Sequence, residues 1–328
     1  MASFRVAITD QGFPDLDAER RELAAVGAEI VAGQCRTEDE VLALAQGADA
    51  ILCDASPITR RVLAGLPRLR VVSEYGIGVD NVDLAAASEL GVWVANVPGF
   101  CTAEVADHTM ALLLAAARRV VLHDRSVRAG GWGPADAFGP VERLSDQALG
   151  LIGFGRIGSA VARRARGFGL RVLAYDPAIP DAAVREQGAQ PADLETLLAE
   201  ADYVSLHLPA TPQTRGLLSA RHIALMKPGA WLINTARGAL VDEEALADAL
   251  RSGRLAGAAL DVRRAEPPGP LDPLRDLPNV ILTPHCAYYS RRSLAELQLA
   301  AARNVVAVLR GGAPATPVNP GIAPRRIP

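Results

Sequence analysis

The chain has 328 residues, 50% of them hydrophobic and 4% aromatic, and a formal net charge of −3. This length exceeds one ordinary hydrophobic core, so we expect two domains. The balanced charge argues against nucleic-acid binding, and no apolar run reaches the roughly 18 residues that span a membrane. The cysteines show neither paired nor metal-ligand spacing and no leader segment is evident, which together favour reduced thiols in the cytoplasm and no metal site; they are Cys35, Cys53, Cys101 and Cys286.

The first hundred residues alternate short apolar runs with segments of helical period. This alternation predicts a parallel sheet with right-handed crossovers. Strands are expected at residues 5–9, 50–53, 71–74 and 93–96, and helices near residues 15–25, 38–46, 59–66 and 84–90.

The pattern changes after Asn96-Val97-Pro98-Gly99. Residues 103–128 are interpreted as one long helix, followed by a stretch that contains glycine, proline and tryptophan. A second alternating series then predicts strands at residues 149–152, 170–175, 203–206, 230–234, 258–262 and 280–282. Residues 293–309 are helical again and could return to the first domain, so that the chain would cross twice between domains.

A glycine motif at residues 153–158 follows the strand at 149–152 and precedes a segment of helical period. Gly153, Gly155 and Gly158 would let the backbone approach a pyrophosphate at the helix N-terminus, where unpaired N–H groups favour anions. The next strand ends at Asp176, where a carboxylate can accept hydrogen bonds from the adenosine ribose hydroxyls. The alternative is a glycine-rich turn that binds no ligand. Because Asp176 would repel a 2′-phosphate, the motif favours NAD over NADP.

Three polar residues follow apolar runs of the second series, where ligands meet open α/β sheets. They are Arg237, Glu266 and His285. Taken singly, they could be a surface charge, a solvated carboxylate and a turn residue. Together they suit the interconversion of an alcohol and a ketone: a histidine moves the proton, a carboxylate fixes its tautomer, and an arginine binds a substrate carboxylate at two points.

The sequence resembles the D-isomer-specific 2-hydroxyacid dehydrogenases over nearly its whole length. The resemblance rests on an ordered set of motifs, at residues 75–83, 150–158, 175–177, 234–238, 260–262 with 266–267, and 283–285. It implies an α/β fold of two doubly wound parallel-sheet domains with a cleft between them. Residues 1–102 and 286–328 would form a flavodoxin-like substrate domain. Residues 103–285 would form an inserted Rossmann NAD-binding domain, with an arm at about 105–147 that builds a homodimer.

The resemblance also implies residue roles. His285 would be the acid/base, Glu266 its partner, and Arg237 the group that binds the substrate carboxylate. Further substrate contacts would come from Ile77, Gly78 and Tyr288. NAD would be held by Gly153, Gly155, Arg156, Ile157, Gly158, Asp176, His207, Pro209, Thr214, Thr235, Ala236 and Asp261, the last of these near the nicotinamide amide.

The implied activity is reduction of a small 2-keto acid of the glyoxylate or hydroxypyruvate kind, or oxidation of a D-2-hydroxy acid. Residues 283–290 are most similar to the C-terminal-binding-protein branch, so an NAD-sensing module that recruits a peptide stays an alternative. A reductase of a phosphorylated or phosphonate keto acid is another, although Glu74 stands where many relatives carry arginine. Ile77 replaces the lysine of phosphite dehydrogenases. Arg263 and Arg264 replace residues that are often aromatic or acidic, and the sequence assigns them no role.

Overall fold

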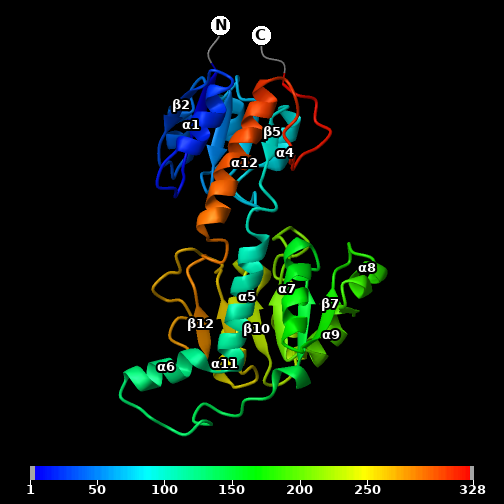
Figure 1. Ribbon diagram of the computed structural model, residues 1–328. Coiled ribbons are helices and arrows are strands. Elements are labelled where there is room, and N and C mark those ends of the chain that lie inside the picture. Colours follow the sequence, from blue (N-terminus) through cyan, green and yellow to red (C-terminus); the bar gives the residue numbers. More distant parts are fainter. Residues whose placement is uncertain (1–3, 326–328) are drawn as a thin grey trace. The chain divides into compact units, whose positions relative to one another are not determined.

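The computed structural model describes residues 4–325 and divides into two compact units, each built on one parallel β-sheet (Figure 1). Unit 1 runs up to Cys101 and includes the chain from Ser290 onward, and unit 2 comprises Thr102–Tyr289. The prediction of two parallel-sheet α/β domains is confirmed.

The sheet of unit 1 has the strand order β2-β1-β3-β4-β5, and all of its pairings are parallel. This is the flavodoxin-like order. Strands β3 and β4 are buried along their whole length, as expected of a sheet covered on both faces. The sequence analysis missed β2, an edge strand without a buried residue. The strands are β1 (Arg5–Ile8), β2 (Glu29–Ala32), β3 (Ala50–Cys53), β4 (Val71–Glu74) and β5 (Trp93–Ala95).

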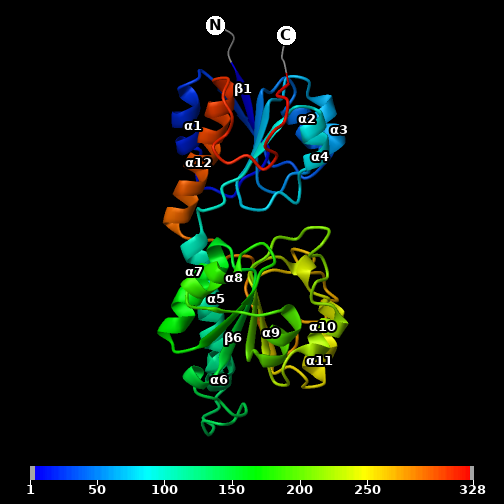
Figure 2. The same ribbon diagram turned by 90° about the vertical axis from the view of Figure 1, so that its right-hand side faces the viewer.

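Four of the five helices described in unit 1 begin at residues with capping side chains, and α1 is the exception. Thr37 forms a capping box with Glu40, and Thr59, Asp83 and Ser290 each accept a bond from a first-turn N–H. The last helix packs on α1 and lies against β3 and β4, although it follows them by more than two hundred residues (Figure 2). The helices are α1 (Asp17–Ala24), α2 (Glu38–Leu44), α3 (Arg60–Gly65), α4 (Leu84–Glu89) and α12 (Arg291–Leu309).

The sheet of unit 2 has the order β12-β11-β10-β9-β6-β7-β8, again with parallel pairings. Without β12 this is the Rossmann order, and the direction of the strand order reverses between β6 and β9. Ligands of such sheets bind outside the carboxyl ends of the strands at this reversal. The strands are β6 (Ala148–Ile152), β7 (Arg171–Tyr175), β8 (Gln190–Pro191), β9 (Tyr203–Leu206), β10 (Trp231–Asn234), β11 (Gly257–Leu260) and β12 (Val280–Leu282).

Successive strand residues of unit 2 enter different cores on the two faces of the sheet. Leu151 and Ile233 pack with α5 and α7, whereas Ile152 and Leu232 pack with α9, α10 and α11. This explains why the strands are apolar in nearly every position. The helices are α5 (Thr102–Ala117), α7 (Arg156–Gly167), α8 (Asp181–Glu186), α9 (Leu194–Glu200), α10 (Ala220–Leu225) and α11 (Glu243–Arg251).

The prediction of one helix over residues 103–128 is wrong. Helix α5 ends at Ala117, and a separate helix α6 (Val120–Arg128) follows. Arg119 has a left-handed backbone with φ of 55°, which interrupts the helical hydrogen-bond ladder. Its guanidinium donates to the Ala116 carbonyl at 3.1 Å and lies 5.0 Å from the ring centroid of Trp231, which stabilises the break.

The buried carboxyl group of Glu74 lies at the carboxyl end of β4 in unit 1. Glu74 is 1% exposed. The Cys53 thiol donates to its Oε2 at 3.1 Å, and the Asn81 amide lies 3.4 Å from both of its oxygens. Burial raises the pKa of Glu74 well above its usual value, against the opposing effect of these hydrogen bonds. Burial therefore favours the protonated form of this carboxyl group in the folded protein.

We predict that Glu74→Gln stabilises unit 1 above neutral pH. The pKa of Glu74 is higher in the native state than in the unfolded chain. Its contribution to the free energy of unfolding is therefore fully present below the unfolded-state pKa and is lost as pH rises toward the native-state pKa. Glutamine is neutral at every pH, and we expect a gain of about 1 kcal/mol or more at pH 9. Hydrogen exchange of the β3 and β4 amides, corrected for intrinsic rates, measures this. The exposed Glu29→Gln variant is the control, and equal pH slopes for wild type and Glu74→Gln would contradict the prediction.

Candidate active site at the carboxyl ends of the unit 2 strands

The glycine loop after β6 forms a cradle of bare backbone. Gly153 has φ of 97°, and a Cβ there would lie 2.6 Å from the His207 carbonyl oxygen. A Cβ at Gly158 would lie 2.2 Å from the Gly153 carbonyl oxygen. Gly155 has open space where its side chain would be, and no described side chain caps the helix α7 that begins after it. The first N–H groups of α7 thus have no side-chain cap, which suits this helix N-terminus to bind a pyrophosphate.

Asp176 lies at the end of β7, next to this cradle. Its carboxylate accepts hydrogen bonds from the backbone N–H of Phe154 at 2.7 Å and of Ala178 at 2.9 Å, which ties β7 to the glycine loop. A cavity of about 430 Å³ lies beside it, large enough for an adenosine group. Asp181 and Asp193 also line the cavity, so its rim carries three carboxylates. These acceptor carboxylates therefore fit a dinucleotide whose ribose has free hydroxyls.

The other predicted cofactor residues also follow β6, β9, β10 and β11. Arg156 and Ile157 open α7. His207 follows β9 and bonds to Ser205 at 3.0 Å through Nε2; burial lowers its pKa to about 3, so the ring is neutral.

Two of the predicted hydroxyls are engaged within the protein. Thr214 donates to the Pro209 carbonyl at 2.6 Å, and Thr235 bonds to the Thr109 hydroxyl at 2.9 Å. Ala236 offers a carbonyl that accepts from Arg237. Direct contacts of these residues with NAD stay predictions.

Arg237 lies in a turn that the buried side-chain amide of Asn234 stabilises. Asn234 is 1% exposed and ends β10. Its side chain donates to the Arg237 carbonyl at 2.9 Å and accepts from the Ala236 N–H at 3.0 Å. The half-buried Arg237 guanidinium donates to the Ala236 carbonyl at 2.8 Å. The sequence analysis did not single out Asn234, although the motif that it quoted contains this residue.

His285 and Glu266 form a close pair. The distance from His285 Nδ1 to Glu266 Oε2 is 2.5 Å, and the side chains are 42% and 36% exposed, so a substrate can reach them. Partial burial would raise the pKa of Glu266, but the hydrogen bonds from His285 and the Arg263 N–H, with the charges of His285 and Arg237, hold that pKa below its usual value. Glu266 is therefore ionised and bound to Nδ1, which leaves Nε2 as the nitrogen that can exchange a proton with a substrate.

The turn that carries His285 is held by Asp261, which follows β11. His285 has a left-handed φ of 51°, and its N–H donates to the Asp261 carbonyl at 2.7 Å. The Asp261 carboxylate, 1% exposed, accepts from the Thr283 hydroxyl at 2.5 Å and from the N–H groups of Cys286 at 3.0 Å and Ala287 at 2.9 Å. Asp261 thus stabilises a backbone conformation that a non-glycine residue seldom adopts.

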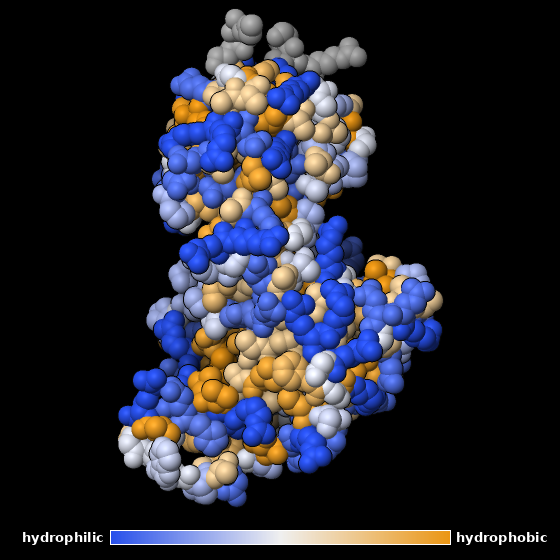
Figure 3. Space-filling view, viewed as in Figure 1, coloured by the Kyte–Doolittle hydropathy of each residue, from blue (hydrophilic) through white to orange (hydrophobic). Residues whose placement is uncertain are grey.

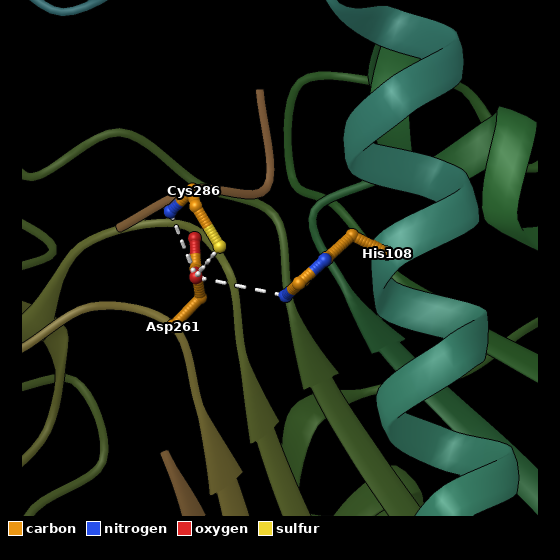
Figure 4. A group of neighbouring side chains, drawn as sticks. All are labelled: His108, Asp261 and Cys286. Atoms are coloured by element: carbon orange, nitrogen blue, oxygen red, sulfur yellow. Dashed lines mark hydrogen bonds and ion pairs between the residues drawn. The ribbon is translucent and has the colours of Figure 1, made fainter. Parts of the chain in front are cut away.

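His108, Asp261 and Cys286 gather at this turn (Figure 4). His108 Nε2 lies 3.1 Å from the Thr283 hydroxyl and 3.6 Å from Asp261 Oδ1. Burial, followed by the charge of Asp261, raises the pKa of the Cys286 thiol, which opposes a metal-binding thiolate. Because the Asp261 oxygens already accept protein hydrogen bonds, the group is explained as support for the turn.

The predicted substrate residues divide between the two units. Tyr288 lies in unit 2, where its ring centroid is 6.3 Å from that of His285 at an interplanar angle of 81°. Ile77 and Gly78 lie in unit 1, in the loop after β4, where the Asn96 amide donates to the Ile77 carbonyl at 2.7 Å. Unit 2 therefore brings Arg237, Glu266, His285 and Tyr288 to the carboxyl ends of β10, β11 and β12, and the roles of Ile77 and Gly78 stay predictions.

Comparison with known proteins identifies the class of site. A sequence profile of the D-isomer specific 2-hydroxyacid dehydrogenase NAD-binding domain matches residues 110–287. A glyoxylate reductase of Korarchaeum cryptofilum is 43% identical over 286 residues, which are 84% of this chain and 86% of that protein. The chain belongs to the D-isomer specific 2-hydroxyacid dehydrogenase family. Membership confirms the resemblance seen in the sequence and makes the chain an oxidoreductase of CH–OH groups with NAD as cofactor.

Other relatives differ in substrate. A D-3-phosphoglycerate dehydrogenase of Mycobacterium leprae is 42% identical over 268 residues, which are 80% of this chain but only 50% of that protein. A crystal structure of Aquifex aeolicus D-lactate dehydrogenase, complexed with NAD and lactic acid, is 30% identical with a TM-score of 0.84, and the match covers 94% of this chain and 96% of that one.

Proposed function

We propose that the enzyme interconverts a small 2-keto acid of the glyoxylate or hydroxypyruvate kind and its D-2-hydroxy acid, with Arg237, Glu266 and His285 as catalytic residues. The proposal rests on the 2.5 Å contact between His285 and an ionised Glu266. The positive charge of Arg237 also helps to keep the pKa of Glu266 low. The similarity to a glyoxylate reductase over most of both chains supports the substrate class.

The three side chains divide the chemistry of the keto–hydroxy interconversion. Bound nicotinamide supplies or accepts the hydride. Arg237 binds the substrate carboxylate in a two-point contact and orients the 2-carbon. His285 Nε2 donates a proton to the oxygen that becomes the hydroxyl during reduction, and takes that proton during oxidation. Glu266 stabilises the imidazolium and fixes Nδ1 as the bound nitrogen.

The runner-up substrates carry a second anion, as a phosphorylated or phosphonate keto acid does. The similarity to a phosphoglycerate dehydrogenase supports them. Glu74 opposes them, because many relatives carry arginine at this position, and a second anion would lose that partner where this chain has a buried carboxyl group. A peptide-recruiting role has no comparable support, because the relatives described above are named as a reductase and dehydrogenases.

We also propose that the enzyme is a homodimer. Helix α5 leaves Ala111 exposed and Leu114 and Ala115 partly exposed, with Leu114 also packed against the core of unit 2, and an apolar patch over this helix is visible in Figure 3. In the arm that follows, Val120 and Val127 are about half exposed and Trp132 is 91% exposed. Apolar surface of this kind indicates a protein partner, and sedimentation velocity across a dilution series measures the assembly.

A cytoplasmic location remains part of the proposal, supported by free thiols at all four cysteines. Among residues 4–325, no helix combines the length and the apolar character that crossing a bilayer requires.

We predict that NADH binds far more tightly than NADPH, because Asp176 would face the 2′-phosphate among the carboxylates of the adenosine cavity. The expected preference is at least a hundredfold, or about 3 kcal/mol. Asp176→Ala should reduce the preference for NADH over NADPH, chiefly by improving NADPH binding. Fluorescence titration of both cofactors measures the affinities, and equal affinities in the wild type would refute the assignment.

We predict that Arg237→Lys lowers kcat/KM on the best 2-keto acid by a factor on the order of 100 or more, about 3 kcal/mol of transition-state stabilisation. Lysine keeps the charge but cannot form the two-point contact. NADH affinity should change less than twofold. Near-normal kcat/KM in the variant would show that Arg237 does not bind the carboxylate.

We predict that Glu266→Gln moves the pH profiles of both reaction directions toward lower pH. Glu266 is ionised throughout the neutral range, so its charge favours the imidazolium that reduction needs. Without that charge, the kcat/KM of reduction should fall at a lower pH than in the wild type, and the kcat/KM of oxidation should rise at a lower pH. The measurement is kcat/KM against pH for both directions. His285→Ala should remove most activity in each, and superimposable profiles for wild type and Glu266→Gln would exclude the proposed role of Glu266.

A further inference from the structure

Arg263 is a buried cation held by two carboxylates. The residue is 8% exposed. Its Nε and Nη2 donate to the two oxygens of Glu243 at 3.0 and 3.1 Å. Its Nη2 also donates to Asp272 Oδ1 at 2.7 Å, and its Nη1 bonds to the other oxygen of Asp272. The Asp272 side chain is 2% exposed and that of Glu243 is 14% exposed. Solvent therefore screens these ion pairs little, and four of the five guanidinium N–H groups donate to the two carboxylates.

The two carboxylates come from different segments. Glu243 is the first residue of α11, and Asp272 ends the loop that starts at Arg263 and contains Glu266. Arg263 thus closes this ten-residue loop on itself and anchors it to α11. The Arg264 N–H also donates to Glu243 Oε1 at 2.8 Å, so Glu243 holds the backbone of the loop as well as the side chain.

The anchored backbone bonds directly to the proposed catalytic carboxylate. The Arg263 N–H donates to Glu266 Oε1 at 2.8 Å, while Glu266 Oε2 faces His285. Gly238 completes the arrangement, because a Cβ there would lie 2.0 Å from the Arg263 carbonyl carbon. The absence of a side chain at Gly238 lets the loop pack against the turn of Arg237.

We propose that Arg263 is a positioning residue for the acid/base pair: its ion pairs with Glu243 and Asp272 fix the N–H that holds Glu266 Oε1, and thereby direct Oε2 at His285. The inference rests on the proposed roles of Glu266 and His285. Arg263 has no assigned contact with substrate or cofactor, so it acts through Glu266 alone. The charged groups around the Glu266 carboxylate are His285 and Arg237. The charge of Arg275 lowers the pKa of Asp272, and the ring of Tyr288 packs beside that of His285.

The decisive variant is Arg263→Lys, which keeps the positive charge but cannot bind two carboxylates at two points each. Arg221→Lys is the matched control, because Arg221 forms an exposed ion pair with Glu195 on the surface. Glu266→Gln and the double variant Arg263→Lys/Glu266→Gln complete a cycle that measures whether the two residues act together.

Two readouts are made on the whole protein. The first is the pH dependence of kcat/KM for reduction. The second needs no turnover: NMR of protein with labelled histidines follows the pH at which the His285 ring takes up its proton, and the chain has only five histidines to assign. We expect Arg263→Lys to lower kcat about tenfold and to move both pH readouts down, in the direction of Glu266→Gln. NADH affinity should stay within twofold. The double variant should show no further shift beyond Glu266→Gln.

A merely structural role for Arg263 gives a different result. In that case Arg263→Lys lowers thermal stability and activity, but both pH readouts match the wild type and its losses add to those of Glu266→Gln; this outcome overturns the inference. If Glu266→Gln itself shifts neither readout, the proposed function of the pair fails, and the inference fails with it for that separate reason. Should Arg263→Lys not fold, Asp272→Asn removes one ion pair with an isosteric side chain; a downward shift supports the inference and an unchanged profile refutes it.

Discussion

A single buried carboxylate fixes the position of the proposed acid/base. Asp261 follows β11 and accepts hydrogen bonds from two backbone N–H groups and a hydroxyl of the turn after β12. This turn needs a left-handed residue at its centre, and that residue is His285. Such a conformation costs of order 1 kcal/mol or more in a residue with a side chain, so neighbouring bonds must hold it. Because β11 and β12 are adjacent parallel strands, Asp261 and the turn after β12 lie side by side and can bond directly. His285 is therefore held at the edge of the sheet and not in a mobile loop.

The partner of His285 comes from a less regular part of the chain. Glu266 lies in a loop without helix or strand, between β11 and β12, where backbone entropy would favour many positions. Two constraints limit that freedom: the ion pairs of Arg263 and the close packing of Gly238 on the loop backbone. The site thus combines a histidine held by hydrogen bonds to a strand end with a glutamate held by buried charge.

Much of this arrangement could be predicted from the sequence, because it depends on local patterns. The apolar runs of β3, β4, β6 and β9 gave strands close to those observed, and the residues after β10 and β12 identified Arg237 and His285. What the sequence could not indicate depends on contacts distant in the chain. The break between α5 and α6 is stabilised by the distant Trp231, which lies against the Arg119 guanidinium, and β2 lacks the buried residues that mark a strand.

Arg263 is the clearest case of such a limit. An arginine directly after a buried strand has the pattern of a surface charge. Only the structure shows that Glu243, twenty residues earlier, and Asp272, nine residues later, meet it at one point. Charge pairing between separate segments leaves no periodic signal in a single sequence, whereas glycine loops and strand ends do.

Three carboxyl groups at the ends of buried strands or just beyond them illustrate how surroundings decide chemistry. The partners of Glu74 are a thiol and a distant amide, so burial prevails and raises its pKa well above the usual value. Glu266 is more exposed and faces an imidazole, a backbone N–H and the field of an arginine, so it is ionised despite partial burial. Asp261 is as buried as Glu74 but receives two backbone N–H donors and serves to shape a turn. All three side chains are carboxylic acids at or beyond the carboxyl end of a buried strand. The number and charge of the hydrogen-bond donors that surround each one distinguish a buried core group, the partner of a base and a structural anchor.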